Sequence, residues 1–175
     1  MLIAAWVVGG LVALVLLLAL VGVFLPRGHV ATSSVRLTAS PQAVWTVLAD
    51  DAAMSTWAPG VTAVERLADR DGRPAWKLVI GRHAMPLVVE IEDPPRRRVT
   101  RMLDDGLAFG GTWTWEIAAD GAGSRVTVTE DGFVKNVVFR ALARFAFGHH
   151  TTIETFLAAL ALRMGDDAAR VERVS

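Results

Sequence analysis

The sequence has no cysteine among its 175 residues and no net charge, because 18 Lys and Arg residues balance 18 Asp and Glu residues. The absence of cysteine excludes disulfide bonds and thiol chemistry, although a reducing compartment and a cysteine-free exported domain both fit it. A chain without excess positive charge has no electrostatic basis for binding nucleic acid. We therefore predict no nucleic-acid partner and a site that works without thiols.

Motifs for nucleophilic catalysis and phosphate binding are also missing. No serine or histidine falls in a nucleophile motif, and the glycine pair at 110–111 predicts a strand bend or bulge. His150 and Glu154 share a predicted helix face, but without a third ligand we predict a solvated pair. His29 and His83 fall in or near predicted loops and have no evident partner. The sequence predicts neither a metal site nor a cofactor.

A long apolar run begins the chain, because residues 2–25 contain no charged residue. As a helix rising 1.5 Å per residue, the run would be about 36 Å long and would cross a hydrocarbon core of about 30 Å. A cleaved signal peptide is the alternative, but its apolar stretch is only about 7–15 residues and follows a basic start. Here Met1 is followed directly by Leu2. We predict that residues 1–25 form a single-pass membrane anchor.

The residues after this run indicate how the rest of the chain is organised. Arg27 and Arg36 follow the run and only the α-amino group precedes it, so the positive-inside rule favours the cytoplasmic side for the soluble part. Residues 26–34 are small and polar, which predicts a flexible linker, and residues 166–175 form a charged tail that we expect to fray. The remaining residues, 35–165, have the usual size of one domain.

The first part of this domain carries clear helix signals. Ser40 can accept hydrogen bonds from the free amides of a helix that begins at Pro41. Asp50 and Asp51 suit a helix N-terminus better than a C-terminus, so the first helix ends there. A second short helix is predicted at residues 52–57.

Alternating apolar and polar residues predict about seven strands in the domain. They cover residues 35–38, residues 61–67, "AWKLVI", "PLVVEIE", residues 97–103, "GTWTWEI" and "SRVTVTE". Apolar positions then recur every three or four residues from Lys135 to Met164, which predicts one long amphipathic helix. An antiparallel sheet with one apolar face and one helix to cover it is an α+β fold. We expect a space between the curved sheet and that helix.

Four stretches of the sequence resemble the SRPBCC superfamily, also called START-like or helix-grip. They are "SPQAVWTVLADDAAMSTWAPGVTAVE", "GTWTWEI", "TVTEDG" and "VKNVVFRALARFAFG". Over residues 35–165 the chain is similar to the bacterial polyketide cyclase/dehydrase and lipid transport branch. The resemblance implies a helix-grip fold, in which the two short helices close one end of the cavity, with Trp57 and Pro59 near its mouth. It also implies an apolar ligand, although the superfamily ranges from lipid carriers to cyclases.

Eleven residues on the apolar strand faces and the inward helix stripe are expected to line the cavity. They are Trp76, Leu78, Leu87, Val89, Trp113, Trp115, Leu142, Phe145, His149, Ile153 and Phe156. The tryptophans are expected to pack the core as well as line the cavity. His149 is the one ionisable residue on the inward stripe, and it fits a polar handle for a ligand, a general base or a satisfied buried histidine.

The number of inward ionisable groups separates two functions. An enzyme places an acid and a base within reach of one point, whereas a carrier needs one or two polar groups to orient its ligand. With His149 alone, the sequence favours a membrane-anchored, non-catalytic carrier or binder of a lipid or other hydrophobic small molecule. The alternative is a cyclase- or dehydratase-type enzyme acting on a polyketide-like substrate in the same cavity. Arg96 and Arg98 either face anionic lipid or form an ordinary exposed strand end.

Overall fold

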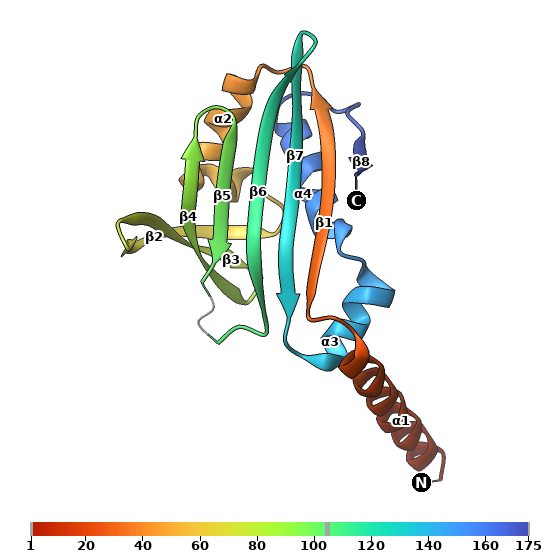
Figure 1. Ribbon diagram of the computed structural model, residues 1–175. Helices are drawn as coiled ribbons and strands as arrows, with labels where there is room; N and C mark the ends of the chain where they lie inside the picture. The colour runs from red at the N-terminus through yellow and green to blue at the C-terminus, as the bar shows by residue number, and fades with distance from the viewer. Residues whose placement is uncertain (1, 104–105, 175) are drawn as a thin grey trace.

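The computed structural model describes residues 2–103 and 106–174. Its first element is α1 (Leu2–Phe24), a helix that protrudes from the rest of the chain (Figure 1). By length and composition, its segment Trp6–Phe24 can cross a membrane, and nearly all of that segment is exposed. The predicted anchor is therefore a continuous helix that does not pack into a core.

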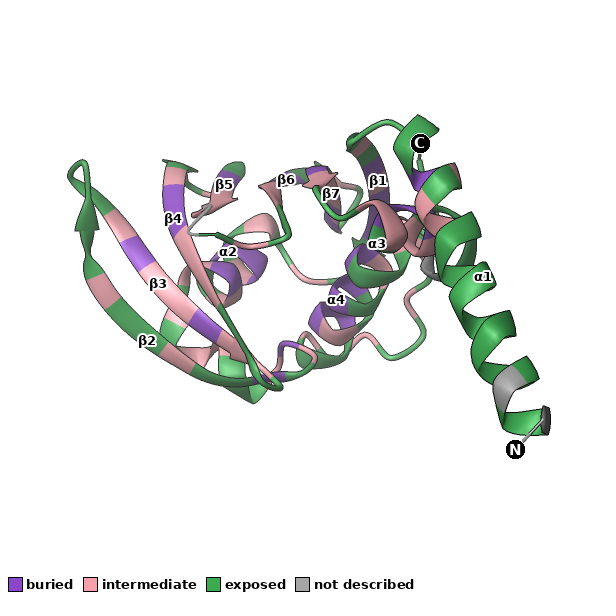
Figure 2. Cartoon of the chain, turned by 90° about the horizontal axis from the view of Figure 1, so that it is seen from below, coloured by how far each residue is buried: buried purple, intermediate pink, exposed green. Residues whose placement is uncertain are grey.

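The rest of the described chain forms an α+β domain on one eight-stranded antiparallel sheet. The strands are β1 (Gly28–Leu37), β2 (Val61–Arg70), β3 (Arg73–Ile80), β4 (His83–Asp93), β5 (Arg97–Met102), β6 (Phe109–Asp120), β7 (Gly123–Val134) and β8 (Val171–Arg173). Their order across the sheet is β2-β3-β4-β5-β6-β7-β1-β8. The sheet curves around the helices on its concave face (Figure 2), which confirms the predicted fold class.

Two short helices follow β1, as the sequence predicts. They are α2 (Pro41–Ala49) and the 3-10 helix η1 (Asp51–Thr56). Ser40 Oγ accepts a hydrogen bond from the amide of Ala43, and the Asp50 carboxylate caps η1 in the same way. These caps satisfy amides that the first turns leave free. α2 packs against β6 and β7 and covers one end of the concave face.

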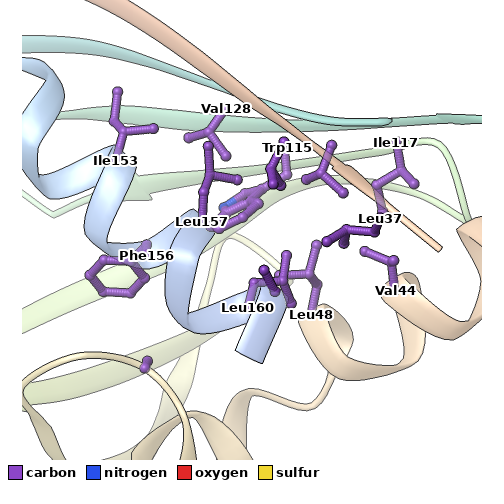
Figure 3. Close-up of a cluster of buried hydrophobic side chains, with 14 of the residues drawn as sticks. Leu37, Val44, Leu48, Trp115, Ile117, Val128, Ile153, Phe156, Leu157 and Leu160 are labelled. Atoms are coloured by element: carbon purple, nitrogen blue, oxygen red, sulfur yellow. The ribbon is translucent and has the colours of Figure 1, made fainter. Parts of the chain in front are cut away.

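The helix α4 (His150–Arg163) lies against the concave face, where it contacts β1 and β7. Its residues Ile153, Leu157 and Leu160 are fully buried. They share one core with residues of the sheet and of α2, including Leu37, Val44, Leu48, Trp115, Ile117 and Val128 (Figure 3). This core fixes the position of α4 over the sheet and so defines the space beside it.

β1 begins earlier than predicted, so residues 28–34 belong to the sheet and pair with β7 in continuous register. This corrects the prediction of a flexible linker. Ala31, Ser33 and Ser34 are buried, but they are too small or too polar to produce the apolar alternation on which strand prediction depends. The predicted tail also contributes to the sheet, since residues 171–173 form β8 beside β1.

The predicted long C-terminal helix is two helices separated by an irregular turn. α3 (Val137–Leu142) runs into a π-helical turn, η2 (Ala143–Phe147), and Gly148 then adopts a φ of +72° before α4. A residue with left-handed φ interrupts a right-handed helix, and glycine adopts it without steric cost. The break directs α3 mainly against α1, and α3 contacts the sheet only slightly, at β7 (Figure 1). The apolar positions before and after Gly148 therefore do not form one inward stripe.

α3 is fixed to the C-terminal end of α1 by Arg140, whose charged side chain is buried. Its guanidinium donates to the carbonyl oxygens of Gly22 and Leu25 and to two carbonyls just before α3, over distances of 2.9–3.2 Å. At Gly22 the helices are so close that a Cβ would lie 1.9 Å from the carbonyl oxygen of Val137. The apolar helix and the domain are thus joined by a packed contact, not by a flexible tether.

Candidate ligand-binding site

A cavity of about 360 Å³ lies between the concave face of the sheet and the helices. Its wall comes from the start of β1, from β3 to β7, from α2 and η1, and from the chain between η2 and the first half of α4. Most lining side chains are apolar, and a few polar ones interrupt them. A cavity of this size and composition suits a small organic molecule that is mainly apolar.

Six of the eleven predicted lining residues lie on the cavity wall. They are Leu78, Leu87, Trp113, Trp115, His149 and Phe156. Trp113 and Trp115 occupy alternate positions of β6, and the Phe156 ring meets Trp113 edge to face, with ring centroids 5.2 Å apart. The contact joins α4 to the sheet, so these aromatic residues pack the core and line the cavity together.

The other five predicted residues lie outside the cavity wall. They are Trp76, Val89, Leu142, Phe145 and Ile153. Ile153 is fully buried in the core, Trp76 packs at the margin of that core, and Val89 is buried next to a register shift between β4 and β5. Leu142 and Phe145 precede the helix break, and Phe145 is 69% exposed because the chain turns outward there.

The cavity reaches the surface at the end of the sheet from which α1 emerges. His29, at the start of β1, lines the cavity, as do Phe109 at the start of β6 and Val134 at the end of β7. Phe109 is also 41% exposed, so it belongs to the rim. Trp57 and Pro59, which the resemblance places near the mouth, do not line the cavity.

A buried ion pair lies in the cavity wall where α2 meets η1. Arg98 is 4% exposed and donates to a carboxylate oxygen of Asp51 at 2.5 Å and to the carbonyl oxygen of Leu48. Both alternatives that the sequence offers for Arg98 are therefore wrong. Arg98 pairs with Trp115 in the register of β5 and β6, so its side chain points to the concave face. Arg96 is exposed.

Two histidines and a glutamate form a polar cluster on the cavity wall near the rim. His29 Nε2 lies 3.1 Å from Glu130 Oε1, and the His29 ring stacks on the His149 ring with centroids 3.9 Å apart and planes 18° apart. All three side chains line the cavity. The carboxylate and the stacked ring hold His29 from two directions, so the cluster presents its polar groups in one fixed arrangement.

Burial lowers the pKa of His149 below its ordinary value of 6.5. The neighbouring His29 ring lowers the pKa further, whereas the Glu130 carboxylate opposes the effect. His149 is therefore neutral at pH 7, and a neutral imidazole has one hydrogen-bond donor and one acceptor. Such a side chain can bind a hydroxyl or a carbonyl group of a ligand.

Glycines make room for this cluster. A Cβ on Gly132 of β7 would lie 2.6 Å from His29 Cε1 and 3.0 Å from a Glu130 carboxylate oxygen.

On β6, Gly111 has a φ of +148°, and its Cβ would lie 2.3 Å from the nearest carbonyl oxygen of β7. The register between β6 and β7 is continuous through Gly110 and Gly111, so these glycines permit close strand packing instead of the predicted bend or bulge.

Sequence reasoning missed His29 and Glu130 for different reasons. His29 falls within the predicted linker, where no inward direction could be assigned. Glu130 carried a usable signal, because it continues the alternation of Val126 and Val128, both fully buried, along β7. The predicted strand "SRVTVTE" already ends at Glu130, so following its alternation one step past Val128 would have placed a carboxylate on the inward face.

The cluster offers hydrogen bonding and proton transfer as its chemistry. Among residues 2–103 and 106–174, no group of three or more His, Cys, Asp or Glu side chains is arranged to hold a metal ion. The Glu130 carboxylate contacts the His29 ring, and the His29 ring stacks on the His149 ring, so the three groups are neighbours on the wall. The cavity therefore contains more ionisable groups than the single inward histidine that the sequence predicts.

We expect stability to fall between about pH 7.5 and about pH 5.5, in part through His149. Because its pKa is lower in the folded chain than the ordinary 6.5, the unfolded chain binds more protons as the pH falls through that value. The contribution of His149 to the free energy of unfolding is therefore present above pH 6.5 and is lost as the pH falls below that value. Urea titrations at both pH values should show a smaller pH dependence for His149→Leu than for the wild type. Equal pH dependence of the two proteins would contradict the assignment.

Residues 28–165 match the model of a protein family described as "Polyketide cyclase / dehydrase and lipid transport". This match covers the whole domain from the start of β1 to the end of α4. No curated protein matches the sequence.

Several solved structures are also similar to this chain in fold. The ZhuI aromatase/cyclase from Streptomyces sp. R1128 is 16% identical, with a TM-score of 0.62 over 81% of this chain and 96% of that one. A START superfamily protein from Mycobacterium smegmatis is 21% identical, with a TM-score of 0.60 over 78% and 97% of the two chains. A protein from Thermobifida fusca is 22% identical, with a TM-score of 0.61 over 79% and 94%. At these identities the likeness concerns the fold.

Proposed function

Because this chain belongs to the polyketide cyclase/dehydrase and lipid transport family of START-like proteins, we propose that it is a membrane-anchored protein that binds a lipid or other hydrophobic small molecule. The observation that carries this proposal is the cavity of about 360 Å³, whose apolar wall is interrupted near its rim by His29, Glu130 and His149. Apolar walls supply affinity for a hydrophobic body, and a few fixed polar groups orient it.

The polar cluster narrows the kind of ligand. A neutral His149 favours an uncharged group that donates or accepts hydrogen bonds, and the Glu130 carboxylate disfavours an anion beside it. We therefore propose a ligand with an apolar, partly flat body, which packs on Trp113 and Trp115, and a hydroxyl or carbonyl group at the rim.

Membrane anchoring is the second part of the proposal. α1 is apolar, exposed and long enough to cross a bilayer, and exposing such a helix to water is unfavourable. Arg27 and Arg36 follow it, which favours a domain on the cytoplasmic side. In this arrangement the rim of the cavity and the end of α1 lie at the same end of the domain.

Acid–base catalysis is a second candidate function. An enzyme of this kind needs both an acid and a base in its cavity, and the cluster supplies several ionisable groups where the sequence predicts a single histidine. His149 can accept a proton from a bound substrate, and His29 with its Glu130 partner can relay or donate one. In this form the protein is a cyclase- or dehydratase-type enzyme. Conversion of a bound molecule, rather than retention of it, distinguishes the enzyme from the carrier.

The proposed role of His149 is tested with a matched pair of probes, 1-hydroxypyrene and pyrene, which differ only by a hydroxyl group. We expect the wild type to prefer 1-hydroxypyrene by about 1–3 kcal/mol, which is about fivefold to 150-fold in Kd. His149→Leu should bring this ratio close to one, because the hydroxyl loses its partner. Both affinities are measured by fluorescence titration of the full chain in detergent.

His83→Leu is the control, because His83 is exposed and lies outside the cavity. This variant should keep the wild-type preference. An unchanged probe ratio in His149→Leu would remove the proposed hydrogen-bonding role. Failure of both probes to bind the wild type would contradict the proposal that the cavity accepts hydrophobic molecules.

A further inference from the structure

We infer that α3 and η2 form a membrane-docking surface, which lies in the head-group layer beside α1 and lets the cavity open directly to the bilayer. This surface is residues 137–147, and its proposed partner is the lipid surface of the membrane that holds α1. The inference rests on the proposed anchor and goes beyond it, because an anchor alone sets no contact between the domain and lipid.

The position of α3 along α1 is the first argument. Gly22 is buried against the backbone of Val137, and Arg140 binds the carbonyl oxygens of Gly22 and Leu25. Gly22 lies in the last turn of the apolar segment Trp6–Phe24, and Leu25 directly follows that segment. When that segment spans a bilayer, its end lies at the boundary between hydrocarbon and head groups. α3 is packed beside it and therefore lies at the same depth.

The side chains on α3 and η2 are the second argument. Phe139 is 60% exposed and Phe145 is 69% exposed, which is unfavourable in water and favourable at a membrane interface. Residues 137–147 contain two arginines and no acidic residue. Arg140 is buried in its contact with α1, whereas Arg144 is exposed. An exposed cation on the same segment as two exposed aromatic rings matches the chemistry of a head-group layer that contains anionic lipid.

The link between this surface and the cavity is the third argument. Ala143, the first residue of η2, lines the cavity, and so do Gly148 and His149 just after it. One short segment therefore borders the cavity on one side and carries the exposed Phe145 on the other. The exposed rim residue Phe109 lies at the same end of the sheet. An apolar ligand can pass between bilayer and cavity here without crossing water.

The absence of cysteine makes a depth measurement straightforward, because each substitution introduces the only thiol of the chain. Full-length Phe139→Cys and Phe145→Cys are labelled with a bimane fluorophore and reconstituted in phosphatidylcholine vesicles that contain some phosphatidylglycerol. Quenching by lipids with a nitroxide in the shallow or the deep part of the acyl chain reports the depth of each label. Iodide in the buffer reports its exposure to water.

Two further positions serve as references. Leu14→Cys lies in the middle of α1 and tests the anchor alone. Leu162→Cys is the matched control, because Leu162 is 61% exposed but lies at the far end of α4. That end adjoins the end of β1, where Asp166 binds the amide of Thr38, far from α1 (Figure 1).

We expect shallow nitroxides to quench the labels at 139 and 145, deep nitroxides to quench the label at 14, and iodide alone to quench the label at 162. Labels at 139 and 145 that behave like the label at 162 would overturn the docking surface while leaving the anchor in place. Labels protected from both lipid and iodide would also overturn it, since a protein surface would then cover them. Absence of lipid quenching at 14 would instead overturn the proposed anchor.

Discussion

Replacing Arg140 by methionine is expected to detach α3 from the end of α1. The buried guanidinium donates to four backbone carbonyl oxygens, and methionine fills similar space but donates no hydrogen bond. Hydrogen bonds to charged groups contribute about 1.5–3 kcal/mol each, although several from one side chain are not additive. We expect local opening of α3 to become easier by about 3 kcal/mol, which corresponds to about 150-fold faster amide exchange.

Hydrogen exchange of the full chain in uncharged detergent micelles, where Arg144 has no anionic lipid to bind, followed by mass spectrometry of peptides that contain residues 137–142, measures this effect. Arg144→Met is the matched control, because Arg144 lies on the same segment but is exposed. It should leave exchange in α3 close to that of the wild type. Equal exchange in the wild type and Arg140→Met would show that other contacts hold α3 against α1.

The second large effect is expected from Arg98→Met. This change leaves the Asp51 carboxylate without its cation in a cavity wall where its side chain is only 11% exposed. Removing one partner of a buried ion pair costs about 3–5 kcal/mol. For a chain of this size we expect the midpoint of thermal unfolding to fall by about 10 °C.

Arg97→Met provides the comparison, since Arg97 is the exposed neighbour of Arg98 on the same strand. It should change the midpoint little. The double variant Arg98→Met with Asp51→Leu should recover much of the loss, because no unpaired charge is then buried. A midpoint for Arg98→Met within about 2 °C of that of Arg97→Met would contradict a structural role for the pair.

The sequence predicts the fold well wherever large apolar residues set the period. Trp113 and Trp115 define the inward face of β6, and Ser40 with Pro41 marks the start of α2, as the structure confirms. Residues 28–34 of β1 escaped prediction because their buried positions are occupied by small and polar side chains. Their burial results from long-range pairing with β7 and from the helix above them, and local alternation does not contain that information.

The site was less predictable than the fold because it depends on two tertiary events. The φ of Gly148 divides the C-terminal helix, so His149 remains at the cavity while Phe145 turns outward. A glycine within a helical pattern indicates only a small local cost. Pairing of β1 with β7 then brings His29 within hydrogen-bonding distance of Glu130, although 101 positions separate them in the sequence. Only the folded chain identifies this partnership.

The central claim is that the cavity holds a hydrophobic small molecule, and native mass spectrometry of the full chain, released from detergent micelles, tests it most directly. Thr100 lines the cavity, so Thr100→Trp should fill it. Thr127→Trp is the control, because it adds the same side chain on the opposite face of the sheet, where Thr127 alternates with the buried Val126 and Val128. We expect wild type and Thr127→Trp to retain a bound molecule that organic solvent extracts, and Thr100→Trp to lose it. Equal retention of that molecule by all three proteins, or its absence from the wild type, would contradict the claim.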